Sequence, residues 1–147
     1  MASRRQSGIH DLLGFRRVLV VDDQEDAAEL LGMLLTEHGH AARLAHDGES
    51  ALALAREFLP QVALLDLGLP GMDGYQLAAR LRESHRDCRL IAISGYCAPR
   101  DRERSLAAGF ECHLSKPFSF ETLLLTIDAV SSAPPTESLD AQSRAEC

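Results

Sequence analysis

The sequence is poor in lysine and lacks tryptophan altogether. It has 147 residues, of which 15 are basic and 22 acidic, and its formal net charge is −7. Fourteen of the basic residues are arginines, so Lys116 is the single lysine. Proteins that bind nucleic acid concentrate positive charge against the phosphate backbone, whereas this chain has an excess of acids. The composition therefore predicts a protein that does not bind nucleic acid.

Motifs for metal binding through thiols and for membrane insertion are also missing. The four cysteines (Cys88, Cys97, Cys112 and Cys147) form no C-x-x-C pair, which argues against a zinc site or a dithiol redox motif. No apolar run approaches the ~18 residues of a membrane helix, and no apolar segment of signal-peptide length follows Met1. We therefore expect a cytoplasmic protein with free thiols and no contact with membranes.

The length fits one domain. Hydrophobic residues make up 46% of the chain, and a chain of this size buries roughly 70% of its surface on folding. We expect residues 1–15 to form a flexible leader, although Ile9, Leu12 and Leu13 have the spacing of a short docking helix. Residues 131–147 lack apolar periodicity and are expected to be a disordered tail. The domain is predicted over residues 16–130, and both end segments are too short for an output domain.

Short apolar runs alternate with amphipathic segments along the domain. The runs predict strands at residues 18–21, 40–45, 62–65, 90–93 and 112–114. Five helical segments follow them in turn, and the fourth, near residues 99–108, is weak and polar. This alternation predicts an α/β fold of the (βα)5 type, a doubly wound five-stranded parallel sheet with helices on both faces.

Local signals place several helix ends. The first helix is predicted to turn Leu30, Leu31, Leu34 and Leu35 inward, because they recur at helical spacing. Gly39 and Gly109 are expected to end helices. Asp73 is the expected N-cap of the third helix, and Asp47–Gly48 is predicted to form a turn.

Acidic residues follow two of the predicted strands. Asp22 and Asp23 come directly after the first strand, and Asp66 ends the third. Ligands of open α/β sheets bind beyond the carboxyl ends of the strands, so three carboxylates are expected to converge if these strands are neighbours. Such carboxylates raise one another's pKa unless a cation lies between them, and oxygen ligands of this kind suit Mg²⁺. The alternative is that Asp22 and Asp23 only cap a helix.

Two further polar groups are expected at the same edge. Ser94 ends the fourth strand and Lys116 follows the fifth, so a hydroxyl and a mobile positive charge would lie near Asp66. An aspartate beside Mg²⁺ can act as a nucleophile on phosphorus, and phosphoryl transfer needs cations around the transferred oxygens. Pro117 permits a cis peptide that would fix the direction of Lys116.

Taken together, these motifs resemble the receiver domain of bacterial two-component response regulators. The resemblance covers roughly residues 17–130 and includes the Leu-Pro-Gly-Met-Asp-Gly sequence after Asp66, as well as Ser94-Gly95 and Lys116-Pro117. It implies a flavodoxin-like sheet with strand order 2-1-3-4-5. The form of the motifs is most similar to receivers attached to hybrid sensor kinases, so the chain is either a stand-alone receiver or part of a larger protein.

The resemblance also implies roles for single residues. Asp66 would be the phosphoacceptor. Asp23 would bind Mg²⁺ directly, Asp22 mainly through water, and the backbone carbonyl of Gly68 would be a further ligand.

Readout of the phosphoryl group would use the other end of this edge. Ser94 would hydrogen-bond the phosphoryl group and move inward, and Lys116 would pair with its oxygens. The family usually has an aromatic switch residue three positions before the lysine, where this chain has His113. This histidine is either a switch that also titrates near neutral pH or an ordinary buried residue.

The resulting functional hypothesis is a signalling switch rather than an enzyme acting on other molecules. A sensor histidine kinase or histidine phosphotransfer protein would phosphorylate Asp66. The face of the fourth helix, fifth strand and fifth helix would then bind a protein target, or form a homodimer. A Mg²⁺-dependent phosphohydrolase is a weaker alternative because Gln24 replaces the second acid of a D-x-D motif. A flavin module is disfavoured by the acids after the first strand. A receiver-like module that only binds partners is the last alternative.

Overall fold

The sheet is parallel and has five strands, as predicted. The computed structural model describes residues 16–95 and 99–132. Its strands are β1 (Arg17–Val21), β2 (Ala41–Ala45), β3 (Val62–Asp66), β4 (Arg89–Ser94) and β5 (Cys112–Ser115). They are hydrogen-bonded in the order β2-β1-β3-β4-β5. This confirms both the fold class and the strand order implied by the resemblance.

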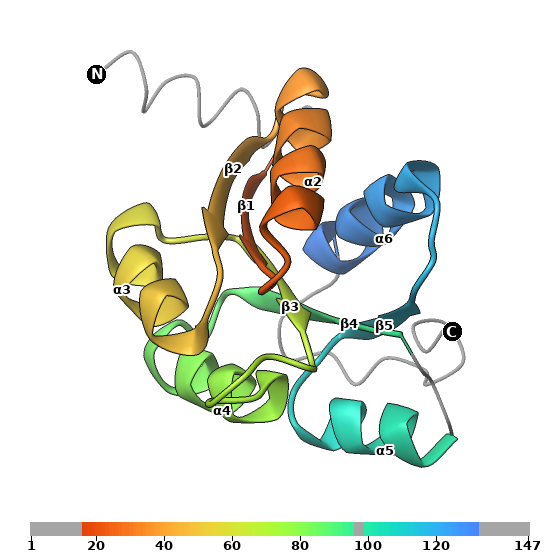
Figure 1. Cartoon of the computed structure of the whole chain (residues 1–147). Helices are drawn as coiled ribbons and strands as arrows, with labels where there is room; N and C mark the ends of the chain where they lie inside the picture. Colours follow the sequence, from red (N-terminus) through yellow and green to blue (C-terminus); the bar gives the residue numbers. More distant parts are fainter. Residues whose placement is uncertain (1–15, 96–98, 133–147) are drawn as a thin grey trace.

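Helices cover both faces of the sheet. They are α2 (Glu25–Glu37), α3 (Gly48–Phe58), α4 (Gly74–Ser84), α5 (Pro99–Ala107) and α6 (Phe120–Ser132). In Figure 1, α2 and α6 lie on one side of the sheet, and α3, α4 and α5 lie on the other. Among the described residues, none of the helices is both long and apolar enough to cross a lipid bilayer.

Two separate apolar cores result from this layering. Alternate residues of a strand point to opposite faces, so Leu19 belongs to the core beneath α3 and α4, whereas Val18 and Val20 belong to the core beneath α2 and α6. All five residues of the central strand β3 are buried, as expected for a strand with helices on both sides.

Several predicted helix ends are confirmed. Gly39 and Gly109 follow helices with positive φ angles of 94° and 104°, a conformation that glycine adopts without a steric penalty. Asp73 caps α4, and its side chain accepts a hydrogen bond from the Gln76 N–H, while the Gln76 side chain accepts one from the Asp73 N–H. This reciprocal pair of hydrogen bonds fixes the residue at which α4 begins.

Two local predictions need correction. Asp47–Gly48 does not form a separate turn, because Asp47 is the N-cap of α3 and accepts a hydrogen bond from the Ser50 N–H. Leu30 does not point inward, since it is 57% exposed. The inward face of α2 is formed by Ala28, Gly32 and Leu35, which are buried, and by Leu31, which is partly buried against the same core, so Leu31 and Leu35 are as predicted. A Cβ at Gly32 would lie 2.9 Å from the Leu44 side chain, so this glycine lets α2 approach the sheet more closely than the leucine spacing suggests.

The last helix continues to residue 132, two residues beyond the predicted end of the domain. Our expectations of a leader at 1–15 and of a tail beyond residue 132 lie outside the described residues, as do those for Cys97 and Cys147. Cys88 and Cys112 are buried free thiols, as expected.

Candidate functional site

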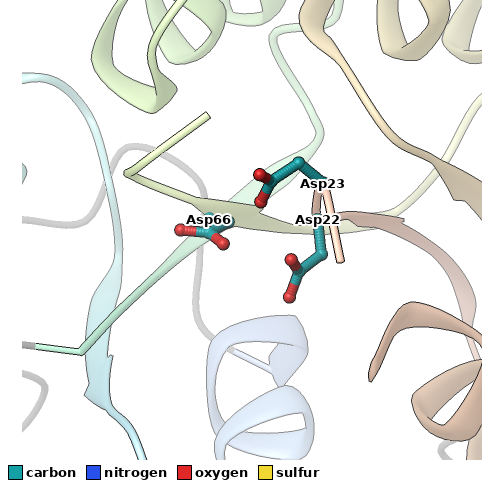
Figure 2. Close-up of side chains that lie close together, drawn as sticks. All are labelled: Asp22, Asp23 and Asp66. Atoms are coloured by element: carbon teal, nitrogen blue, oxygen red, sulfur yellow. The ribbon is translucent and has the colours of Figure 1, made fainter. Parts of the chain in front are cut away.

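Two neighbouring strands bring the three predicted carboxylates together. β1 pairs with β3 in parallel, with Val21 opposite Leu65, so the residues that follow emerge at the same edge of the sheet. Figure 2 shows Asp22 and Asp23 on one side of this edge and Asp66 on the other. One carboxylate oxygen from each of the three lies within 4.8 Å of the others. The sequence prediction that these acids converge is therefore confirmed.

Backbone N–H groups hold two of the carboxylates in place. The Gln24 N–H donates to Asp22 Oδ1 at 2.9 Å, and the Gly68 N–H donates to Asp66 Oδ1 at 2.9 Å. Gln24, which precedes α2, makes no side-chain cap hydrogen bond. Asp22 therefore lies at the helix start without acting as the conventional N-cap, and the interpretation of the acids as simple caps does not explain the cluster.

Burial makes the charge of this cluster costly. Asp22 is 5% exposed and Asp66 8%, whereas Asp23 is exposed. Burial raises the pKa of the Asp22 carboxyl above its ordinary value. The negative charge of Asp66 adds to this effect, while the Gln24 N–H and the Lys116 ammonium oppose it. The site thus holds more negative charge than its immediate surroundings neutralise.

Lys116 is the basic side chain that reaches these acids among the described residues. Its Nζ lies 3.4 Å from Asp66 Oδ2 and 3.6 Å from Asp22 Oδ2. The Lys116–Pro117 peptide is cis, as the sequence suggested. The Lys116 N–H donates to the Ser94 carbonyl at 2.7 Å, which ties the residue to the end of β4. One ammonium shared by two carboxylates leaves the cluster short of positive charge, and its hard oxygen donors fit a divalent cation such as Mg²⁺.

Ser94 and His113 lie at the other half of the same edge. Ile93 is opposite Asp66 in the pairing of β3 with β4. Ser94 follows Ile93 and therefore lies on the neighbouring strand, one residue further towards the carboxyl edge than Asp66. Its Oγ lies 2.9 Å from His113 Nε2. His113 is 1% exposed in this structure. The role of His113 as a switch stays a prediction, as does that of the Gly68 carbonyl as a metal ligand.

Sequence reasoning missed three residues that contact this edge. Gly74 begins α4 against the end of β3, where an added Cβ would lie 2.7 Å from Leu67 Cα and 2.8 Å from the Asp66 carbonyl oxygen. His46 Nδ1 lies 3.0 Å from the Asp22 carbonyl oxygen. Ser105 Oγ lies 3.0 Å from His113 Nδ1. The Asp-Gly pair at the start of a helix was a visible signal for Gly74, whereas nothing in the sequence pattern marked His46 or Ser105.

Comparison with known proteins agrees with this geometry. The model of the response regulator receiver domain matches residues 18–128. The probable transcriptional regulatory protein TcrX of Mycobacterium tuberculosis is 37% identical over 113 residues, which are 77% of this chain and 48% of TcrX. An uncharacterized 14.6 kDa protein of Leptolyngbya boryana is 36% identical over 68% of this chain and 78% of its own length. The chain thus spans about half the length of TcrX, and likewise half of the response regulator MprA of Mycobacterium avium, to which it is 33% identical.

Solved structures have the same fold. The chemotaxis protein CheY4 of Vibrio cholerae is similar with a TM-score of 0.76 and 28% identity, over 79% of this chain and 98% of CheY4. NtrX of Brucella abortus is similar with a TM-score of 0.74 and 30% identity, over 79% of this chain and 27% of NtrX. The match of the family model, together with the arrangement of the sheet, shows that the chain belongs to the response regulator receiver domain family.

Proposed function

We propose that this receiver domain is a phosphorylation-dependent signalling switch whose phosphoacceptor is Asp66. The observation that carries the proposal is the convergence of Asp22, Asp23 and Asp66 with the Lys116 ammonium 3.4 Å from Asp66 Oδ2. A carboxylate oxygen of Asp66 would form the new bond to phosphorus as the bond between phosphorus and the donor breaks. The product is an acyl phosphate on Asp66, and the donor leaves with the electron pair of the broken bond.

Mg²⁺ is the cofactor that we assign to the acidic cluster. Asp22, Asp23 and Asp66 would hold it, with the Gly68 carbonyl as a further ligand. When bound, Mg²⁺ neutralises charge on the oxygens of the transferred phosphoryl group. Lys116 supplies the second positive charge, and its flexible stem lets the ammonium follow the phosphoryl oxygens as they move from donor to Asp66.

The partners in this proposal are proteins. A sensor histidine kinase or a histidine phosphotransfer protein would donate the phosphoryl group. Leu30 and Met33 support a protein partner beside the site, because they are 57% and 61% exposed on α2, the helix that begins two residues after Asp23. The face formed by α5, β5 and α6 would bind the downstream target or a second copy of the chain. The domain would act only on its own phosphoryl group, as a switch rather than as an enzyme with an external substrate.

No observation favours the alternative functions. Gln24 stands where a phosphohydrolase of the D-x-D type has its second acid. The acidic cluster beyond β1 would repel the phosphate of a flavin.

The proposal is tested by intact mass spectrometry of the chain incubated with Mg²⁺ and acetyl phosphate. We expect one phosphoryl group on the wild type and none on Asp66→Asn, because the amide is not a nucleophile towards phosphorus. Asp73→Asn is the matched control, since it makes the same chemical change at a helix cap beside the site and should leave the modification intact. An unmodified wild type, or a phosphorylated Asp66→Asn variant, would contradict the assignment.

A further inference from the structure

A buried histidine connects the candidate phosphorylation site to helix α5. His113 lies on β5 and is 1% exposed. Its Nε2 lies 2.9 Å from Ser94 Oγ at the end of β4, and its Nδ1 lies 3.0 Å from Ser105 Oγ on α5. Ser105 is fully buried, with 0% exposure. Both ring nitrogens are therefore in hydrogen-bond contact with a hydroxyl, and the two hydroxyls come from different elements.

The proton inventory of these three groups links their orientations. A neutral imidazole has one N–H donor and one acceptor nitrogen, and each serine hydroxyl has a single proton. If Ser94 donates to Nε2, the ring proton is on Nδ1 and Ser105 must accept. If the ring proton is on Nε2, Ser94 must accept and Ser105 donates to Nδ1. Each group carries one proton in both arrangements, so only the order of the hydrogen bonds differs.

The position of Ser94 makes this order sensitive to events at Asp66. Ser94 is the residue after Ile93, which pairs with Asp66, and its carbonyl accepts a hydrogen bond from the Lys116 N–H. A phosphoryl group on Asp66 presents oxygens that only accept hydrogen bonds. A Ser94 hydroxyl that donates to such an oxygen cannot donate to His113 at the same time.

We propose that Ser94, His113 and Ser105 form one ordered hydrogen-bond chain, in which phosphorylation of Asp66 selects the Nε2–H tautomer of His113 and turns Ser105 into a donor. Ser105 is then a positioning residue that acts through His113 and carries the change to α5. This inference rests on the proposed phosphorylation of Asp66. It requires no rotation of the His113 ring between buried and exposed positions, because the signal is the order of protons within the buried chain.

The test is the tautomer of His113, measured by long-range ¹H–¹⁵N NMR of the imidazole nitrogens in the full chain. Spectra are taken with Mg²⁺ alone and with Mg²⁺ plus acetyl phosphate, and intact mass spectrometry of the same samples reports the phosphoryl group. We expect a neutral ring whose ratio of Nε2–H to Nδ1–H tautomers rises roughly two- to tenfold on phosphorylation, the scale of one net hydrogen bond. An unchanged tautomer ratio, or a doubly protonated ring, would overturn the proposed hydrogen-bond chain.

Variants at Ser105 separate its hydroxyl from its packing. Ser105→Ala should keep the tautomer change, which Ser94 causes, but abolish the phosphorylation-dependent shift of the α5 backbone amide signals, and Ser105→Thr should restore that shift. Ser105→Val has the bulk of threonine without the hydroxyl and should not restore it. Ser84→Ala removes an exposed serine hydroxyl of α4 and should behave as wild type. A normal phosphorylation-dependent shift of the α5 amide signals in Ser105→Ala and Ser105→Val would show that Ser105 has no positioning role.

One arm of the experiment is independent of phosphorylation. In Ser94→Ala without acetyl phosphate, the ordered hydrogen-bond chain predicts a changed tautomer ratio at His113, because the hydroxyl that donates to Nε2 is lost. If the wild type gains no phosphoryl group, the proposed function fails. The Ser94→Ala measurement then still decides whether Ser94, His113 and Ser105 form an ordered hydrogen-bond chain. An unchanged ratio in Ser94→Ala would contradict the chain even where Asp66 is phosphorylated.

Discussion

The two halves of the sheet's carboxyl edge handle polar groups in opposite ways. At β1 and β3, charged carboxylates converge, and the burial of Asp22 raises its pKa. At β4 and β5, neutral hydroxyls contact an imidazole that is almost completely buried. A neutral polar group is buried at little cost once it is hydrogen-bonded, whereas a buried charge needs a counterion. The acidic half is therefore suited to recruiting a cation, and the neutral half to transmitting a change inward.

The largest effect is expected from a steric clash between the start of α4 and the end of β3, next to the acidic half. Gly74→Ala places a Cβ within 2.7 Å of Leu67 Cα and 2.8 Å of the Asp66 carbonyl oxygen, both of which are backbone atoms. We expect the free energy of unfolding to fall by about 3 kcal/mol, the upper end for overpacking, and phosphorylation of Asp66 to be lost because α4 must move. Chemical denaturation and mass spectrometry measure the two effects. Gly95→Ala, at the same edge, is the control, because no atom of the described residues beyond its chain neighbours lies within 4 Å of the added Cβ. Equal stability of the two variants would contradict the prediction.

The neutral half is broken by His113→Leu. The substitution keeps the bulk of a buried side chain but removes a partner from both serine hydroxyls, so we expect a loss of about 2 kcal/mol in the free energy of unfolding. The stabilisation by Mg²⁺, measured as a shift in melting temperature, should stay as in the wild type, because the acids are untouched. A variant that also lost the Mg²⁺ response would show that Mg²⁺ binding at the acids depends on His113.

The charge of the acidic half is tested by Asp22→Asn. The amide oxygen still accepts from the Gln24 N–H, but the buried charge is gone. We expect Mg²⁺ binding to weaken at least tenfold, or about 1.4 kcal/mol, as measured by titration calorimetry.

The same variant should melt at a higher temperature than the wild type when Mg²⁺ is absent. The folded-state pKa of Asp22 is raised above its ordinary value of 3.8, so ionisation of this carboxyl disfavours the folded state at neutral pH. The difference in melting temperature should shrink as the pH falls and vanish only below 3.8, where the wild-type carboxyl is protonated in both the folded and the unfolded chain. A variant less stable than the wild type at neutral pH would contradict this sign.

The smallest effect concerns a second buried imidazole, which tests whether burial keeps histidines of this fold neutral. His40 is 8% exposed, and its Nδ1 accepts a hydrogen bond from the Arg16 N–H at 2.8 Å. Burial lowers the pKa of His40 below its ordinary value of 6.5. Below pH 6.5 the His40 side chain therefore binds a proton more readily in the unfolded chain than in the folded one. The free energy of unfolding should fall as the pH drops below 6.5.

The matched variant is His40→Asn, whose side-chain oxygen can accept from the Arg16 N–H but does not titrate. We expect its free energy of unfolding to depend less on pH below 6.5 than that of the wild type, by at most about 1.4 kcal/mol per pH unit, the limit for one proton. Urea denaturation at several pH values measures this slope. Parallel curves for the two proteins would show that His40 titrates normally.

Sequence reasoning located the acidic half well because charged residues at the ends of buried strands are rare and conspicuous. The strand pattern predicted that Asp22, Asp23 and Asp66 lie at one edge of the sheet. The order of the strands could be predicted only from the family resemblance. The inward face of α2 was partly wrong because leucine spacing alone cannot reveal that Gly32 makes the close contact. Ser105 was not identified because it belongs to a polar helix without periodicity, where one buried serine looks like any exposed one.

The position of Lys116 has a consequence for chemical labelling. As the only lysine of the chain, it carries the only side-chain primary amine, and that amine lies between Asp22 and Asp66 with a third of its side chain exposed. A reagent that acylates primary amines therefore has a single internal target, which is located in the candidate site itself. The extent of labelling at this one position becomes a direct reporter of what occupies the acidic edge of the sheet.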